Sequence, residues 1–397
     1  MSEARVNNLS NESNTGGPTF TGITTFSSPY FFVPPVGNTQ ERPENPEGGS
    51  LRFNTDSKHL EYYRGDTIGW SEVEASNDEL GGGTGSNTGR GYRGLFLAGF
   101  VPSPGQQNTI DYITISTLGD AQDFGDTTIK VFADATCSSR TRAFLMGGSG
   151  TSAQKKEIST NVFASLGNAT DFGDLSDLNY GNQGISDATR GISFGGEGPS
   201  SSAGLNMMEY FTMGSTGAAV DFGDMSNKKI GVFTSASSTR GVIGGGRVAA
   251  PETAALYNGI EFITISTTGN STDFGDLTTA TSGNNSGVSG NSTRGMIVGG
   301  YDYPAVAPSI GYFNNIQFIT IATLGNSQDF GDLLAGRSGG ANCTSPTRAI
   351  VGNGLTPSMT NSIETFIITT AGNSVDFGDT TEARRTSTGA SNAHGGL

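Results

Sequence analysis

Residues 316–332 read IQFITIATLGNSQDFGD, and the fold depends on the pattern that this stretch contains. Its first half alternates β-branched or aromatic residues with other residues, which is typical of a β-strand. A Gly-Asn turn follows, as expected where the backbone needs positive φ. The stretch ends in Asp-Phe-Gly-Asp, a tetrapeptide that occurs six times in the 397-residue chain. The six copies begin at Asp123, Asp171, Asp221, Asp273, Asp329 and Asp376.

A second marker keeps the same period. An Arg followed by Gly or Ala and an apolar run begins at Arg93, Arg142, Arg190, Arg240, Arg294 and Arg348. Each repeat reads as four short strands: the Arg strand, the alternating strand, the Asp-Phe-Gly-Asp strand and a strand of small residues. Because the tetrapeptides lie 47 to 56 residues apart, the period is that of a repeat architecture. Six four-stranded repeats predict an all-β fold, a six-bladed β-propeller over residues 93–397.

The two ends of this region predict how the ring closes. Residues 385–392 resemble the small-residue strand that opens a blade, and the chain stops where the next Arg strand would begin. The Arg strand at Arg93 has no such strand before it. We therefore expect the C-terminal segment to supply the inner strand of the first blade.

Composition excludes several other classes of protein. The chain has 61 Gly and 14 Pro without a three-residue period, which rules out a collagen-like fold. Two Cys and two His leave little room for a disulfide scaffold or histidine-based catalysis. A net charge of −15 disfavours nucleic acid and anionic membrane surfaces as partners. The polar N-terminus lacks a signal-peptide pattern, and no apolar stretch is long enough for membrane insertion. Because the two thiols have no pairing signature, we expect assembly in a reducing cytoplasm.

The repeats resemble those of kelch-type propellers, which carry an early Arg and a Gly pair at the end of the second strand. Four repeats have such a pair, beginning at Gly147, Gly195, Gly244 and Gly299. The tetrapeptide has Phe where a kelch repeat usually has Trp. The resemblance covers roughly residues 85–397 and implies the fold rather than a function.

The segment before the repeats divides into three parts. Residues 1–17 are expected to be a disordered or extended arm, 18–75 a small β-rich module, and 76–92 a Gly-rich linker. Residues 51–73 read LRFNTDSKHLEYYRGDTIGWSEV, which predicts strand, turn, strand, turn, strand. With Arg42-Pro upstream, this stretch resembles a module of bacteriophage tail fibres and other virion proteins. The resemblance implies a virion structural protein that the module attaches to the particle or to neighbouring subunits.

The repeated charged residues are interpreted as structural. We expect each Phe of the tetrapeptide to fill the space between blades, and each Asp to cap a turn or pair with the repeat Arg. The Arg itself is expected in an ion pair or as a donor to the backbone. Calcium binding by the tetrapeptide carboxylates is a second interpretation, whereas a kinase metal loop is rejected because the other kinase motifs are missing.

The two cysteines are also interpreted as structural. Cys137 and Cys343 each lie five residues before a repeat Arg, so they are expected at one equivalent, mostly small position, neither disulfide-bonded nor nucleophilic. The corresponding residues of the other repeats are Ile185, Ser235, Ser289 and Gly389.

Variable loops supply the candidate binding residues. The loop between the Arg strand and the alternating strand is longest in the fourth and fifth repeats. Insertions in repeat proteins map to loops, which often bind ligands. These loops carry Tyr257, Tyr301, Asp302, Tyr303 and Tyr312. Tyrosines beside acidic groups suit a saccharide or a protein ligand, and the alternative is that they pack the loop bases. No catalytic residue, metal site or cofactor is assigned.

Taken together, we expect a non-enzymatic phage protein located in the virion and present there in several copies or as a homo-oligomer. It would bind other virion proteins through its N-terminal module, and as a tail-fibre or appendage protein it would contact host surface glycan or receptor protein. A capsid or neck decoration protein is one alternative, and a polysaccharide-degrading propeller enzyme is another. An intracellular kelch adaptor is a third alternative, which the virion-like N-terminus disfavours.

Overall fold

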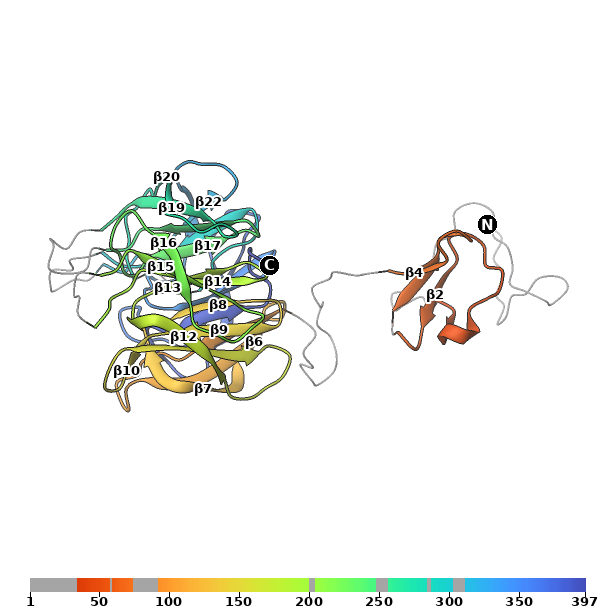
Figure 1. Ribbon diagram of the computed structural model, residues 1–397, viewed down its shortest axis with the longest axis horizontal. Helices are drawn as coiled ribbons and strands as arrows, with labels where there is room; N and C mark the ends of the chain where they lie inside the picture. Colours follow the sequence, from red (N-terminus) through yellow and green to blue (C-terminus); the bar gives the residue numbers. More distant parts are fainter. Residues whose placement is uncertain are drawn as a thin grey trace, which may run out of the picture. The chain divides into compact units, whose positions relative to one another are not determined.

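The computed structural model describes seven stretches of the chain, which form parts of two compact units, residues 1–77 and 78–397 (Figure 1). The described stretches are 34–57, 59–73, 92–199, 204–247, 256–283, 287–302 and 311–397. Among these residues every regular element is a β-strand except one 3₁₀ turn, η1 (Thr39–Glu41), so the all-β prediction is confirmed. None of their helical segments has the length and apolarity needed to span a membrane.

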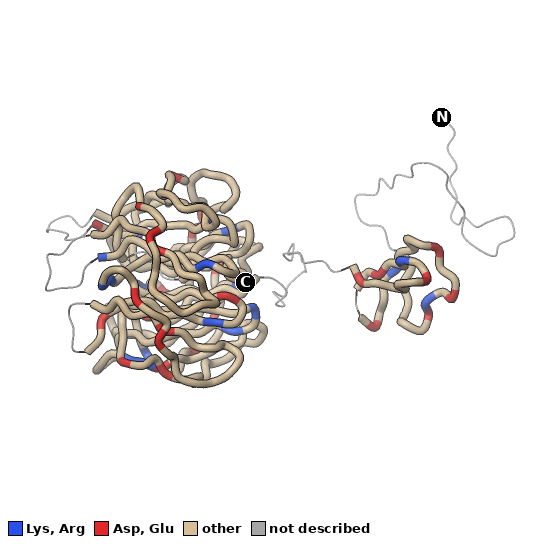
Figure 2. The backbone as a smooth tube through the Cα atoms, turned by 45° about the horizontal axis from the view of Figure 1, so that its top comes forward, with Lys and Arg blue, Asp and Glu red and all other residues tan. Residues whose placement is uncertain are grey.

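Two expected segments fall outside this description. The N-terminal arm at 1–17 and all of the linker at 76–92 except Tyr92 lie outside the described residues, as does the aromatic stretch before Pro34. Acidic residues occur in both units (Figure 2).

The first unit contains one small sheet of four strands in the order β1-β2-β3-β4. Its strands are β1 (Val36–Gly37), β2 (Leu51–Asn54), β3 (Leu60–Tyr63) and β4 (Trp70–Glu72). β1 pairs with β2 in parallel, and β2, β3 and β4 pair as successive antiparallel hairpins. The strand and turn order predicted for residues 51–73 is therefore confirmed.

The second unit contains six antiparallel sheets, which we number 1 to 6. Sheet 1 has β28 (Thr388–Ser391), β5 (Arg93–Leu97), β6 (Gln107–Thr114), β7 (Gln122–Phe132) and β10 (Ser149–Gly150). Sheet 2 has β8 (Ala135–Ser138), β9 (Arg142–Met146), β11 (Lys155–Val162) and β12 (Thr170–Asn179). Sheet 3 has β13 (Gln183–Ser186), β14 (Arg190–Phe194), β15 (Met207–Thr212) and β16 (Val220–Asp224).

The remaining three sheets repeat this arrangement. Sheet 4 has β17 (Phe233–Ala236), β18 (Arg240–Gly244), β19 (Gly259–Thr264) and β20 (Thr272–Asp276). Sheet 5 has β21 (Arg294–Val298), β22 (Asn315–Thr320) and β23 (Gln328–Asp332). Sheet 6 has β24 (Ala341–Thr344), β25 (Arg348–Gly352), β26 (Ser362–Ile367) and β27 (Val375–Asp379). In every sheet except sheet 5 the Arg strand is second, and the strand before it is called the first strand below. In sheet 5 the name first-strand segment is used for residues 287–291, which precede the Arg strand.

Sheet 5 departs from the four-strand prediction. Its first-strand segment makes one isolated bridge, between Gly290 and Gly295, instead of a ladder. Gly290 has a φ of +119°, and a Cβ at this position would lie 2.1 Å from the carbonyl oxygen of Arg294. The backbone therefore turns too sharply here to continue as a strand.

The C-terminal segment completes sheet 1. β28 pairs with β5 in antiparallel register, with Thr388 opposite Leu97 and Ser391 opposite Gly94. This is the strand pairing that the sequence predicted. Beyond β28, the buried Nε2 of His394 lies 3.0 Å from the carbonyl oxygen of Ser138. Burial lowers the pKa of His394 to about 4, so this imidazole is neutral at physiological pH.

Hydrogen bonds join the first strands in a closed order, from sheet 1 through sheets 2 to 6 and back to sheet 1. The donors and acceptors are Thr136 Oγ1 to Gly389 O (2.6 Å), Ser186 Oγ to Ser138 O (2.7 Å), Thr234 Oγ1 to Gly184 O (3.0 Å), Ser289 N to Thr234 O (3.0 Å), Thr344 Oγ1 to Val288 O (3.4 Å) and Thr344 N to Ser391 Oγ (3.2 Å). In Figure 1, β8 and β9 of sheet 2 accordingly lie beside β13 and β14 of sheet 3.

The apolar core consists of six clusters, one between each pair of neighbouring sheets. Each cluster contains one tetrapeptide Phe: Phe124, Phe172, Phe222, Phe274, Phe330 or Phe377. These six side chains are 2–3% exposed. The prediction that they fill the space between repeats is confirmed, and burying each contributes about 2 kcal/mol.

Candidate functional site

The tetrapeptide Gly allows adjacent sheets to approach each other closely. Gly125 of sheet 1 has a φ of +144°, and a Cβ there would lie 2.6 Å from the carbonyl oxygen of Gly167 in sheet 2. The amide of Gly167 donates to the carbonyl of Phe124 at 2.8 Å. The corresponding bond recurs at the other five seams, where each amide donates to the tetrapeptide Phe carbonyl of the preceding sheet: Gly217 to Phe172, Gly269 to Phe222, Gly325 to Phe274, Gly372 to Phe330 and Gly119 to Phe377. The repeated glycine is therefore part of the junction between sheets.

The first Asp of each tetrapeptide has a different environment from the one predicted. All six side chains are exposed, and within the described residues their carboxylates form no hydrogen bond or ion pair. The expectation that they cap turns or pair with the repeat Arg is wrong, because they point to solvent from the strand face opposite the buried Phe. In the part of the chain that the structure describes, no group of three or more His, Cys, Asp or Glu side chains is placed to hold a metal ion.

The repeat Arg side chains connect neighbouring sheets through backbone carbonyls. Nη1 of Arg240 in sheet 4 donates to the carbonyl of Ile321 in sheet 5 at 2.7 Å. The equivalent bonds are Arg93 to Phe163, Arg190 to Ile265, Arg294 to Ile368 and Arg348 to Ile115. Of the two roles predicted for these residues, donation to the backbone is confirmed, and the ion pair with a tetrapeptide Asp does not form. The exception is Arg142, whose guanidinium has no bonded partner among the described residues.

Aromatic rings lie under four of these guanidiniums. The guanidinium carbon of Arg240 lies 4.5 Å from the centre of the Phe262 ring on the third strand of its own sheet. Arg93, Arg190 and Arg294 lie over Tyr112, Tyr210 and Phe318 in the same way. Such contacts add to the carbonyl bond and hold the Arg side chain over the strand.

A second set of charged residues, which was not predicted from the sequence, lies between the sheets. Arg384, Arg337 and Lys229 each lie eight residues after the first Asp of a tetrapeptide. Each reaches a buried acid on the third strand of the next sheet: Arg384 to Asp111 (2.5 Å), Arg337 to Glu364 (2.7 Å) and Lys229 to Glu261. The signal is detectable in the sequence, as a base at this position paired with an acid one repeat later. To recognise this pairing in the sequence, one must know which sheets are neighbours.

Glu209 occupies the same acid position in sheet 3 but has no cation, because Asn179 stands where the base is found in other repeats. Burial raises the pKa of Glu209 above its usual value, and the amide of Ser176 donates to it at 2.8 Å. Burial also acts on Glu261, but there the Lys229 ammonium holds the pKa below its usual value. Sheet 5 has neutral Gln317 at this position.

The cysteines occupy the position expected for them, with one correction. Both are buried free thiols, and burial raises the pKa of each well above its usual value. Cys343 pairs with Ile350, and the residue with the same pairing in sheet 1 is Ala390, opposite Leu95. Gly389, predicted for this position, is one residue out of register.

The structure brings together only part of the predicted tyrosine site. Tyr301 and Tyr312 pair across the loop between β21 and β22, and the amide of Asp302 donates to Gly311 O at 2.9 Å. The Tyr301 ring also packs on Gly283, where a Cβ would lie 2.2 Å from it. Tyr257 belongs to the loop between β18 and β19, and its ring lies 5.4 Å from the Lys229 ammonium. Tyr303 lies outside the described residues.

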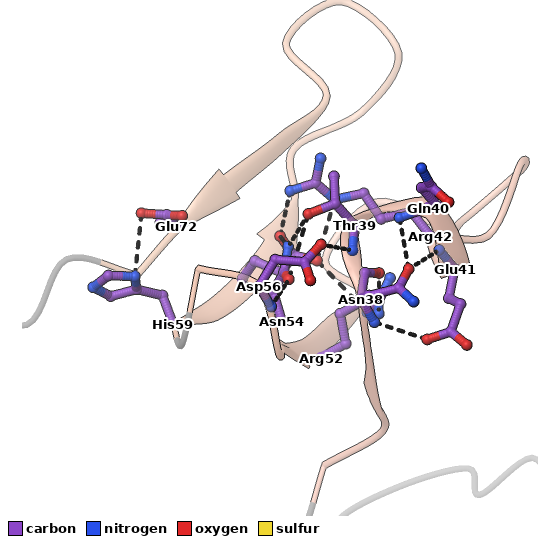
Figure 3. A network of polar contacts seen from close by, with 11 residues as sticks. Asn38, Thr39, Gln40, Glu41, Arg42, Arg52, Asn54, Asp56, His59 and Glu72 are labelled. Atoms are coloured by element: carbon purple, nitrogen blue, oxygen red, sulfur yellow. Dashed lines mark hydrogen bonds and ion pairs between the residues drawn. The ribbon is translucent and has the colours of Figure 1, made fainter.

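The residues that carry the virion resemblance form a buried polar network in the first unit (Figure 3). At its centre is the fully buried Glu61, which accepts hydrogen bonds from Arg42 Nη2 at 2.5 Å and Asn54 Nδ2 at 3.2 Å. Arg52 Nε lies 3.5 Å away on the other side. The hydrogen bond from Arg42 holds the pKa of the Glu61 carboxyl below its usual value. The motif residues Arg42, Arg52 and Asn54 thus serve one buried carboxylate.

A capping box joins this network to η1. The Asn38 side chain accepts from the amide of Glu41 at 3.0 Å, while Glu41 Oε2 accepts from the amide of Asn38 at 2.8 Å. The amide of Thr39 donates to Asp56 Oδ2 at 2.9 Å, which connects η1 to the turn after β2 (Figure 3). His59 is exposed, and its Nδ1 lies 3.5 Å from Glu72 Oε2.

The described part of the first unit, residues 34–57 and 59–73, has no apolar core. Within its described residues, the buried side chains are the polar ones of Arg52, Asn54 and Glu61, and no apolar side chain is buried. Four apolar side chains are instead exposed: Val36 (57%), Leu51 (43%), Ile68 (56%) and Val73 (38%). The described residues therefore give this unit little stabilisation from apolar burial.

No protein-family model matches the chain, and no curated protein matches it either. The function is therefore argued from the residues and their geometry.

Proposed function

We propose that the six sheets of the second unit are the blades of a six-bladed, kelch-like β-propeller. The proposal is supported by the closed order of hydrogen bonds between first strands, by the strand that the C-terminus adds to sheet 1, and by the six equivalent seams. In such a ring each blade buries both faces against its neighbours, and no end needs a cap.

We further propose that the protein is a non-enzymatic structural component of a phage virion, held in the particle by its first unit. The observation that carries this proposal is that the described part of that unit buries no apolar side chain, together with the exposure of Leu51 and Ile68. Contacts with other virion proteins would bury these side chains and supply the stabilisation that the unit lacks. The resemblance of residues 42–73 to a virion module adds to this argument.

Within the virion class, the tail-fibre or appendage role places the loop end of the sheets toward the host. The chain enters the second unit at Tyr92, at the end where each Arg strand begins, and the loops with Tyr301 and Tyr312 follow the opposite ends of these strands. Tyrosine rings beside Asp302 suit a host glycan or receptor protein.

Immunogold labelling of purified particles tests the proposal and separates its versions. We expect label on the tail fibres, whereas label on the capsid or neck would support decoration instead, and absence from particles would refute a virion role. The double variant Leu51→Ser/Ile68→Ser should reduce incorporation at least about tenfold, because about 2 kcal/mol of apolar burial is removed at the contact. Leu118→Ser is the matched control, since this Leu is equally exposed (58%) but lies in the second unit.

A further inference from the structure

The seam between sheets 2 and 3 breaks the pattern of the repeat arginines. In the other five repeats the Arg donates to the carbonyl directly after the third strand of the next sheet. Met213 is the residue that follows the third strand of sheet 3, so its carbonyl is the equivalent acceptor for Arg142. That bond is missing, although Arg142 begins its strand as the other repeat Arg residues do.

A cavity of about 360 Å³ lies at this seam, lined by Arg140, Thr141 and Arg142 on one side and by Ala188, Met213 and Gly214 on the other. Arg140 is particular to this repeat, because the residue before the Thr-Arg pair is Ala188, Ser238, Ser292 or Pro346 in the others. This seam therefore has two guanidiniums, whereas the corresponding position at the seams of these other repeats has one.

Neither guanidinium is neutralised by the chain. No carboxylate lies within 4.0 Å of Arg140 or Arg142 in the described residues. Asp187, the acid beside Ala188, is already occupied by the amides of Thr189 and Arg190, each 2.7 Å from its Oδ1. This is unexpected in a chain with a net charge of −15, whose acidic residues are spread along the strands of the second unit (Figure 2).

We propose that this cavity binds an anionic sugar through its carboxylate or phosphate group. The planar guanidinium of Arg142 has donors free for such a group, which it binds in a forked geometry, and Arg140 adds a second positive charge. Ala188, Met213 and Gly214 provide an uncharged wall for the rest of the ligand, and the volume is within the range of small-molecule sites. The site lies at the opposite end of the Arg strands from the tyrosine loops, so it is distinct from the proposed host contact.

Calorimetric titration of the full chain tests the site with three probes: glucuronate, glucose 6-phosphate and uncharged glucose. We expect binding of one or both anionic sugars, with affinity falling as salt is raised, and no binding of glucose. A response to glucuronate alone assigns the carboxylate, and a response to glucose 6-phosphate alone assigns the phosphate. Absence of binding by both anionic sugars would overturn the proposal.

Two matched variants separate a binding role from a structural one. Arg142→Gln should weaken binding at least about tenfold, the effect of losing a charge-assisted hydrogen bond, while the melting temperature stays unchanged because no bond within the protein is lost. Arg240→Gln should lower the melting temperature and leave sugar binding intact, since this Arg bonds to Ile321. If Arg142→Gln binds as tightly as the native chain, or melts as early as Arg240→Gln, the site is refuted. These measurements use purified protein, so they do not depend on the location in the virion.

Discussion

At the scale of single residues, the charged side chains of this protein belong to two sets with different roles. The first Asp of each tetrapeptide, prominent in the sequence, is exposed to solvent without a partner among the described residues. The less prominent acids of the third strands, such as Glu261 and Glu364, are buried and held by a base from the preceding repeat. Repetition in the sequence therefore identified where charges recur but not which of them are paired. Pairing depends on which strands lie in neighbouring sheets.

Two substitutions at this acid position should change stability in opposite directions. Glu209→Gln should raise the free energy of unfolding at pH 7 by about 1 kcal/mol, because a buried carboxylate without a cation is replaced by an amide that still accepts from Ser176. Glu261→Gln should lower it by about 3 kcal/mol, because Lys229 is left buried without its partner. Urea unfolding of both variants measures the two changes. Gln317 in sheet 5 shows that the position accepts an amide.

The pH dependence separates the two cases further. The pKa of Glu209 is raised in the folded protein, so its contribution to stability is present below the unfolded pKa of about 4.3 and is lost as pH rises through the folded value. The gain from Glu209→Gln should therefore vanish in acid. The pKa of Glu261 is lowered, so its contribution is lost as pH falls through the folded value. Equal changes at pH 4 and pH 7 would contradict this assignment.

At the scale of strands, the sequence predicted most elements and missed two details that depend on the backbone. The strand predicted for the first half of residues 316–332 ends at Thr320, where the amide of Thr323 donates to the carbonyl of Thr320 at 3.1 Å and the chain turns back. Sheet 5 lacks a regular first strand because of the turn at Gly290. The alternation of side chains in the sequence does not show where the first hydrogen bond of a turn forms. The end of each strand therefore could not be predicted, because local backbone geometry determines it.

Deleting residues 384–397 should lower the melting temperature of the second unit by more than about 10 °C, a loss of several kcal/mol. The deletion removes β28 from sheet 1, leaves the edge of β5 unpaired and separates Asp111 from Arg384. Differential scanning calorimetry measures the shift. A chain lacking residues 1–75 is the control and should keep the melting temperature of the second unit. An unchanged midpoint after the C-terminal deletion would show that β28 is dispensable.

At the scale of the whole molecule, the two units differ in how they obtain their stability. The second unit buries six apolar clusters, whereas the described part of the first unit buries a polar network around Glu61. A buried carboxylate held by arginines fixes one arrangement of the strands but contributes less net stability than an apolar core. This contrast is the physical reason for proposing that the first unit is completed by other virion proteins.

The host contact proposed for the loop end makes its own prediction. Tyr301→Ala/Tyr312→Ala should reduce particle adsorption to host cells about tenfold, because two rings worth 1–2 kcal/mol together leave the binding surface. Adsorption assays with normally assembled particles measure the change. Leu118→Ser, at the opposite end of the sheets, should adsorb like the native protein. Native adsorption by the tyrosine variant would show that these rings only pack the base of their loop.

The sequence by itself determined the all-β class, the six repeats, the place of each tetrapeptide Phe and the strand that the C-terminus adds to sheet 1. These features follow from periodicity, since residues with the same local pattern and the same burial recur at fixed spacing. Only the tertiary structure decided which charges are paired, and it alone showed the unpartnered Arg142 and the cavity beside it. The reason is that an ion pair or a cavity forms between strands that lie about fifty residues apart in the chain. Replacement of one residue in either of the two neighbouring sheets decides whether the pair or the cavity is present.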